Sequence, residues 1–468
     1  MSITVNVIAA KITAKQLADV LSSVQAELAT ASASSTPADT LAMSKRLAAA
    51  AAAANGTAST ADTSALAGTI LALLVSSSSI NNINSTSSTA SMLMTFNGVG
   101  TMWSLASSNS RASALTGVSA LSAKLATQQL AVEDAQPVAE FFSTVLGDAM
   151  GLVQEFAASA GNGAAGVAAR ALAAHDVLAS VVLNADSLTR GLLKGATCNG
   201  TAVLIATARI SASVQCVTAA LAATGSVSSS LPSPPGVSSV SSRRRSLMAS
   251  SNSNSNTAAT VSMSVNPAIA PLCAADATCA SAGLDVTTTV LADTSLLLTA
   301  LSGTAVPLVT NLSDYKAGGA VNIISHIVRV AAPGLPSSAI GLSGLVTLNI
   351  PINSTASKLR GANARRAIDV GVVPVDPSAG ISGVRSVTTT SNPETVGNIL
   401  DTVSGNSNNM GDFVVVEYES TTKSNGGSSS ALPELGSNTG AAGPALQPLS
   451  WLTATLVAFA SFTLGKLL

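Results

Sequence analysis

The spacing of apolar residues changes about halfway along the chain. From residue 11 to residue 224, apolar side chains recur three and four positions apart, which is the repeat of one helix face. The strongest such stripe runs from Val138 to Phe156 and holds three of the seven phenylalanines. Because Ala and Ser fill many other positions, these helices are able to approach closely. The pattern therefore predicts a helical domain over residues 11–224, and it includes Thr201–Ala223 as a helix.

From residue 258 to residue 420 the repeat becomes two. Val261, Met263 and Val265 alternate with polar residues, and several later segments show the same alternation between turns rich in Gly, Pro and Asn. This region is expected to form an antiparallel β-sandwich, with Thr287–Leu301 as a helix packed against it. The alternation within residues 1–10 predicts one short strand apart from the rest.

Two segments show neither repeat. Residues 225–257 contain SLPSPPG, three arginines at 243–245 and SNSNSN, so they predict a flexible linker. The arginines are interpreted as a solvated charge run, with a processing site or an anionic contact as alternatives. Residues 421–448, rich in Ser, Gly and Pro, predict a flexible stalk.

The expected fold class is segregated α+β: an N-terminal α-helical bundle, then an antiparallel β-sandwich, with flexible linkers and a C-terminal hydrophobic helix.

The last segment, residues 449–468, is apolar apart from scattered Ser and Thr and the single charge of Lys466. About 20 such residues are enough to cross a bilayer. The small residues 437–440 and an uncharged spacer precede it, which is the order of a glycosylphosphatidylinositol-anchor signal. The attachment candidates are Ser437 and Asn438. The alternatives are a retained membrane helix, which lacks the basic cluster that usually follows one, and a buried core helix.

The start of the chain does not match this tail. Residues 1–10 lack the basic start and the longer apolar run of a secretory signal, although a lipid anchor requires entry into the secretory lumen. Either the true beginning is missing, or the chain is cytosolic and its tail is inserted after synthesis. The strand repeat so close to residue 1 favours a missing beginning.

Composition narrows the function further. The formal net charge is −1 and only 10% of the residues are charged, so phosphate-neutralising surfaces are not expected and nucleic acid is not a predicted partner. Two cysteine pairs with short spacing, Cys198 with Cys216 and Cys273 with Cys279, predict local disulfides, with four unrelated thiols as the alternative. Acceptor sequences for N-glycosylation are present at five positions: Asn55, Asn84, Asn199, Asn311 and Asn353.

Catalytic patterns are scarce. The two histidines, His175 and His326, have no partner arranged for a relay, and neither a nucleophile elbow nor a P-loop is present. Gly161–Gly166 fits GxGxxG, but it follows a predicted helix where a nucleotide site needs a strand. No catalytic, cofactor or metal site is therefore predicted. An enzyme whose site is assembled from distant residues is the remaining alternative.

A helical region followed by a membrane-proximal sandwich resembles the extracellular region of polycystins and adhesion receptors, which carry receptor-for-egg-jelly and GAIN domains. The stretches that carry the resemblance are VAEFFSTVLGDAMGLVQEF (138–156) and SGLVTLNIPINST (343–355). The family's autoproteolysis tripeptide, His-Leu-Ser/Thr, has no counterpart here, so the resemblance does not imply self-cleavage.

These observations together predict a membrane-tethered extracellular glycoprotein at the cell surface. Its role would be structural, adhesive or ligand display, without catalysis. The predicted partners are the membrane, through the tail, and extracellular proteins or glycans. The alternative is a truncated ectodomain of a polycystin-like channel or adhesion-type receptor with one C-terminal transmembrane helix.

Overall fold

The structure is a computed structural model that describes part of the chain. The described ranges are 105–159, 164–223, 227–234, 260–292, 315–352, 368–375, 387–390 and 402–421, together with isolated positions between Lys15 and Trp103. All of them belong to one compact unit, Met1–Gly426.

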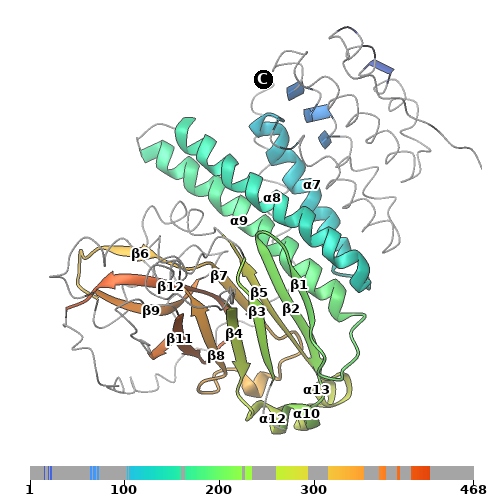
Figure 1. Ribbon diagram of the computed structural model, residues 1–468, viewed down its shortest axis with the longest axis vertical. Helices are drawn as coiled ribbons and strands as arrows, with labels where there is room; N and C mark the ends of the chain where they lie inside the picture. The colour runs from blue at the N-terminus through green and yellow to red at the C-terminus, as the bar shows by residue number, and fades with distance from the viewer. Residues whose placement is uncertain are drawn as a thin grey trace, which may run out of the picture. The chain divides into compact units, whose positions relative to one another are not determined.

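Three long helices form one layer of this unit: α7 (Ser108–Leu125), α8 (Val132–Ser159) and α9 (Ala164–Leu193) (Figure 1). The apolar stripe of α8 is buried from Val138 to Val153, as its repeat requires. Phe141 packs edge to face against Trp103, with ring centroids 6.4 Å apart. Small residues bring α7 and α9 together, since the hydroxyls of Ser119 and Ser180 lie 2.6 Å apart. A Cβ on Gly191 would lie only 3.1 Å from the Leu125 carbonyl oxygen, so glycine allows the close approach at this crossing.

The strands form two antiparallel sheets. The seven-stranded sheet has the order β1-β2-β5-β7-β12, with β6 and β9 also paired to β12. Its strands are β1 (Val203–Ala206), β2 (Ile210–Val217), β5 (Leu284–Leu291), β6 (Val321–Ile323), β7 (Ile327–Ala331), β9 (Ile368–Val375) and β12 (Gly411–Glu419). The five-stranded sheet has the order β10-β11-β8-β4-β3. Its strands are β3 (Ser228–Pro232), β4 (Thr260–Val265), β8 (Val346–Pro351), β10 (Val387–Thr390) and β11 (Thr402–Ser407).

The seven-stranded sheet is the middle layer, buried on both faces. Along β12, Val414 and Val416 join the core shared with the helices, whereas Phe413 and Val415 join the core between the two sheets. This follows from the period of two, which sends successive side chains to opposite faces. The layers are therefore helices, the seven-stranded sheet and the five-stranded sheet.

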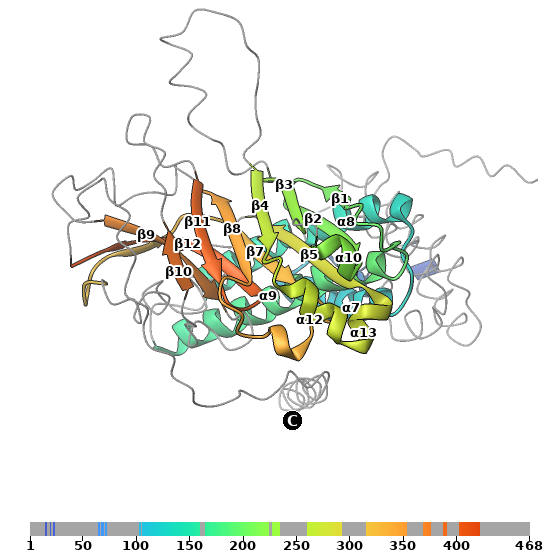
Figure 2. The same cartoon turned by 90° about the horizontal axis from the view of Figure 1, so that it is seen from below.

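Short helices gather at one end of β2 and β5. They are α10 (Ala219–Ala223), α12 (Ile269–Ala275) and α13 (Ala277–Ala282), and both views show them beside one another (Figures 1 and 2). A 3-10 turn, η2 (Ser337–Ala339), precedes β8. These short helices carry two of the four cysteines.

The predicted fold class, with an N-terminal helical bundle separate from a later sandwich, is wrong. The described long helices share their core with the seven-stranded sheet instead of forming a bundle of their own. Strands also begin much earlier than expected, because most of Thr201–Ala223, predicted as a helix, forms β1 and β2. The residues of β2 explain the wrong prediction. Ile210 and Val214 are four positions apart, which matches a helical repeat, but in the structure they lie on one face of a strand and join the core shared with the helices.

Two further expectations change. The predicted helix Thr287–Leu301 begins inside β5, where Thr and Val favour an extended chain. The first part of the predicted linker contains β3 at Ser228–Pro232. The short strand over residues 1–10, the rest of the linker, most of the stalk after residue 421, and the tail 449–468 lie outside the described residues.

The predicted C-terminal hydrophobic helix is not part of the fold that the structure describes, whose last element is the strand β12. Among the described helices, none combines the length and the apolar character that crossing a membrane requires.

Candidate functional site

Two disulfides lie close together in the chain fold, and they join the cysteines that the spacing paired. Cys198 bonds Cys216 with their Cα atoms 4.3 Å apart, and Cys273 bonds Cys279 with theirs 5.1 Å apart. This part of the prediction is confirmed. We call the region formed by residues 197–201, Cys216 and residues 273–283 the disulfide corner.

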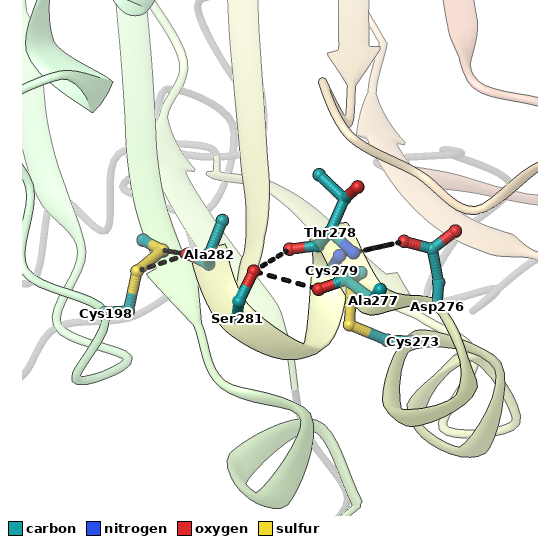
Figure 3. Close-up of a disulfide and its surroundings, with 9 residues drawn as sticks. Cys198, Cys273, Asp276, Ala277, Thr278, Cys279, Ser281 and Ala282 are labelled. Atoms are coloured by element: carbon teal, nitrogen blue, oxygen red, sulfur yellow. Dashed lines mark hydrogen bonds between the residues drawn. A yellow bond between two sulfur atoms is a disulfide. The ribbon is translucent and has the colours of Figure 1, made fainter.

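Helix α13 holds the two bonds in one place (Figure 3). Its N-cap is Asp276, whose carboxylate accepts hydrogen bonds from the backbone N–H of Thr278 at 3.0 Å and of Cys279 at 2.9 Å. At its other end the carbonyl oxygen of Ala282 lies 3.1 Å from Sγ of Cys198. The same short helix therefore carries one disulfide and contacts the other.

Gly283, directly after α13, allows the chain to pass the second disulfide. Its φ of 83° is a left-handed conformation that side chains disfavour. A Cβ at this position would lie 3.0 Å from Sγ of Cys216 and 3.1 Å from Sγ of Cys198. Both the backbone conformation and the available space thus require glycine here.

Asn199 is the one glycosylation candidate that falls within the described residues, and it sits in the turn after Cys198. Its side-chain oxygen accepts a hydrogen bond of 2.9 Å from the backbone N–H of Thr201. The N–H of Gly200, whose φ is 77°, donates to the carbonyl of Cys216 at 3.0 Å. Asn199, Gly200 and Thr201 are all exposed. The sequon is therefore an ordered surface turn beside a disulfide.

The other candidates fall outside the described residues. They are the sequons at Asn55, Asn84, Asn311 and Asn353 and the lipid-attachment candidates Ser437 and Asn438.

Acids of the described helices pair with the largely buried Arg111. Between α7 and α8, Arg111 contacts Asp148 at 3.2 Å and also pairs with Glu155. Burial raises the pKa of the Asp148 carboxyl, and the Arg111 charge opposes that rise. This group therefore holds two helices together.

A second charged group connects the helix layer to the sheet. Arg329 of β7 contacts Asp412 of β12 at 3.1 Å and Asp186 of α9 at 3.7 Å. Asp186 also pairs with Arg190, one helical turn away, at 2.7 Å. We call this set of four residues the helix–sheet charge group.

The end of β12 uses its acids in the same way. Fully buried Glu417 accepts a hydrogen bond of 3.0 Å from Asn322 of β6, and Glu419 pairs with Lys316. In the part of the chain that the structure describes, no three His, Cys, Asp or Glu side chains come together as a metal site would need. The geometry of these acids fits the joining of secondary-structure elements.

Sequence reasoning missed several of these residues. An Asp followed by Ala-Thr-Cys is a recognisable helix start, so Asp276 had a local signal. Arg329 also had a local signal, since it is a single charge within the apolar strand IVRVA. A charge in such a strand needs an acidic partner if it is buried. No local pattern indicated that Gly283 would meet a disulfide formed by cysteines far away in the sequence.

Comparisons with known proteins identify no relative of this chain. No family model matches it, and no curated protein shows significant similarity to it.

Proposed function

We propose that this chain is a membrane-tethered extracellular glycoprotein with a structural, adhesive or ligand-display role and no catalytic activity. The single observation that carries the proposal is the order of small residues, uncharged spacer and apolar segment over 437–468. Such a segment is unfavourable in water, and its order is that of a lipid-anchor signal. The anchor would attach at Ser437 or Asn438.

The described unit lies close to this segment along the chain. About 18 residues separate Glu419, the end of β12, from Ser437. A stretch of that length reaches at most about 60 Å when it is fully extended. A lipid attached at residue 437 or 438 would therefore hold the three-layer unit close to the membrane surface.

Two further observations support the proposal. Disulfides form and persist in oxidising compartments, and both cysteine pairs are bonded. The half-buried Asp148 and the buried Asp412 and Glu417 each bond a side chain of a neighbouring element. Pairs of this kind join the elements of a display scaffold.

The test is release of the protein from intact cells by a phosphatidylinositol-specific phospholipase. The full chain is expected to move from the cell surface into the medium after treatment. A chain that lacks residues 449–468 should be secreted without treatment, because the anchor signal is missing.

A matched variant makes the test specific for the attachment site. Replacing both Ser437 and Asn438 with Leu keeps the apolar tail but removes the small residues, so phospholipase release should fall severalfold. Surface protein that resists the phospholipase in the unmodified chain would contradict the lipid anchor and favour retention of the tail in the membrane. Protein confined to the cytosol would contradict the whole proposal.

A further inference from the structure

We propose that Asn199 is an N-glycosylation site and that its glycan projects from the disulfide corner. The inference rests on the proposed function, since glycan transfer to Asn occurs only on chains that enter the secretory lumen. It goes beyond the presence of a sequon, because the turn itself has the geometry that a glycan needs.

The first requirement is access. Asn199, Gly200 and Thr201 are exposed, and the chain there forms a turn between α9 and β1. Both side chains that define the sequon, the amide of Asn199 and the hydroxyl of Thr201, therefore belong to exposed residues. A glycan at this position would be accommodated without displacing the core.

The second requirement is a free amide nitrogen. The backbone N–H of Thr201 is only able to donate, so the atom of Asn199 that it meets at 2.9 Å must be the oxygen. Nδ2 is therefore not the atom that closes the turn. In the transfer, a bond forms between Nδ2 and C1 of the sugar while the bond between C1 and the pyrophosphate of a lipid-linked donor breaks, and Nδ2 loses one proton. The hydrogen bond to the oxygen survives this change.

The third requirement is a turn that remains the same with the glycan attached. The disulfide at Cys198 fixes one side of it, and the hydrogen bond from Gly200 to the Cys216 carbonyl fixes the other. Neither contact uses the Asn199 amide nitrogen. Modification and the folded disulfide corner are thus compatible.

The experiment uses the full chain in cultured eukaryotic cells, made once as it stands and once behind a cleavable secretion signal. Protein is collected from the cell surface and from the medium and treated with peptide N-glycosidase in heavy-oxygen water, and its peptides are measured by mass spectrometry. We expect Asn199 to be converted to heavy-oxygen-labelled Asp in most molecules. The variants Asn199→Asp and Thr201→Ala should each lose one glycan by gel mobility.

Asn199→Asp is the matched control for folding, because its carboxylate still accepts the Thr201 hydrogen bond. Its amount at the cell surface should equal that of the unmodified chain within about twofold. An unlabelled Asn199 in the protein made with the added signal would overturn the site, whether or not the other sequons carry glycans. Labelling of Asn199 in that protein would support the site even if the phospholipase releases nothing, so the site and the lipid anchor are tested separately.

Discussion

Gly283 shows how one residue determines the geometry of the disulfide corner. Its φ of 83° and ψ of 176° lie in a region that is essentially restricted to glycine, and this conformation costs a side chain about 1–3 kcal/mol. A methyl group there would also press against the sulfurs of Cys198 and Cys216, at 3.1 Å and 3.0 Å. Overpacking of this kind typically adds about 1–3 kcal/mol.

Gly283→Ala is therefore expected to lower the free energy of unfolding by about 2–6 kcal/mol, the sum of the conformational and packing costs. Gly334→Ala is the control for a positive φ without crowding, since Gly334 has a φ of 85° but nothing lies within 4 Å of the position that a Cβ would take there. The free energy of unfolding of this control should fall only by the conformational cost, without the packing cost. Urea unfolding of both variants measures the difference, and equal losses would show that the disulfide moves aside at little cost.

At the scale of elements, the helix–sheet charge group connects α9 to the middle sheet. Arg329 reaches both Asp186 on α9 and Asp412 on β12, and the side chain of Asp412 is only 7% exposed. Removing one partner of a buried pair costs more than removing one at the surface, because the remaining charge is poorly solvated. Arg190 contacts the same Asp186, but its side chain is 55% exposed.

Arg329→Ala should thus destabilise the protein by about 2–4 kcal/mol, whereas Arg190→Ala should cost less than about 1 kcal/mol. Thermal unfolding gives the two losses, and hydrogen exchange along α9 tests where they act. Faster exchange in α9 is expected only for Arg329→Ala. Similar losses for the two variants would mean that Arg329 contributes no more than a surface ion pair.

The elements also show what local patterns were able to predict. The apolar stripe is buried in α8 from Val138 to Val153, and the alternation at Val346, Leu348 and Ile350 forms β8. Each signal depended on neighbours within one element. The segment that forms β2 was predicted as a helix because it lacks the alternation of apolar and charged residues that marks a half-exposed strand. Both faces of β2 are buried, so small polar residues take the place of charged side chains.

At the scale of the whole molecule, the arrangement of layers was beyond local patterns. Val414 contacts the helices and Val415 contacts the second sheet, yet both are equally apolar. Which layer covers each face depends on contacts between distant segments, and the predicted fold class failed at that step. For the disulfide corner, the cysteine spacing predicted the bonds, whereas the contact between Ala282 and Cys198 depended on the folded chain.

The two disulfides should contribute unequally to the stability of the whole molecule. Cys198 lies in the turn after α9 and Cys216 lies in β2, so their bond fixes that turn to the sheet across 18 positions. The bond between Cys273 and Cys279 closes only 6 positions between two short helices. Loop-closure entropy assigns about 3 kcal/mol to the first bond and about 2 kcal/mol to the second.

Replacing Cys198 and Cys216 together with Ser is therefore expected to lower the Tm more than replacing Cys273 and Cys279. The first pair of changes should also expose the end of α9 to limited proteolysis, because the covalent link between the turn after α9 and the sheet is lost. The second pair should affect only the region of α12 and α13. If the ranking were reversed, the stabilisation would come from local packing around α13, and the Cys198–Cys216 bond would contribute less than the shared core and the helix–sheet charge group to holding the layers together.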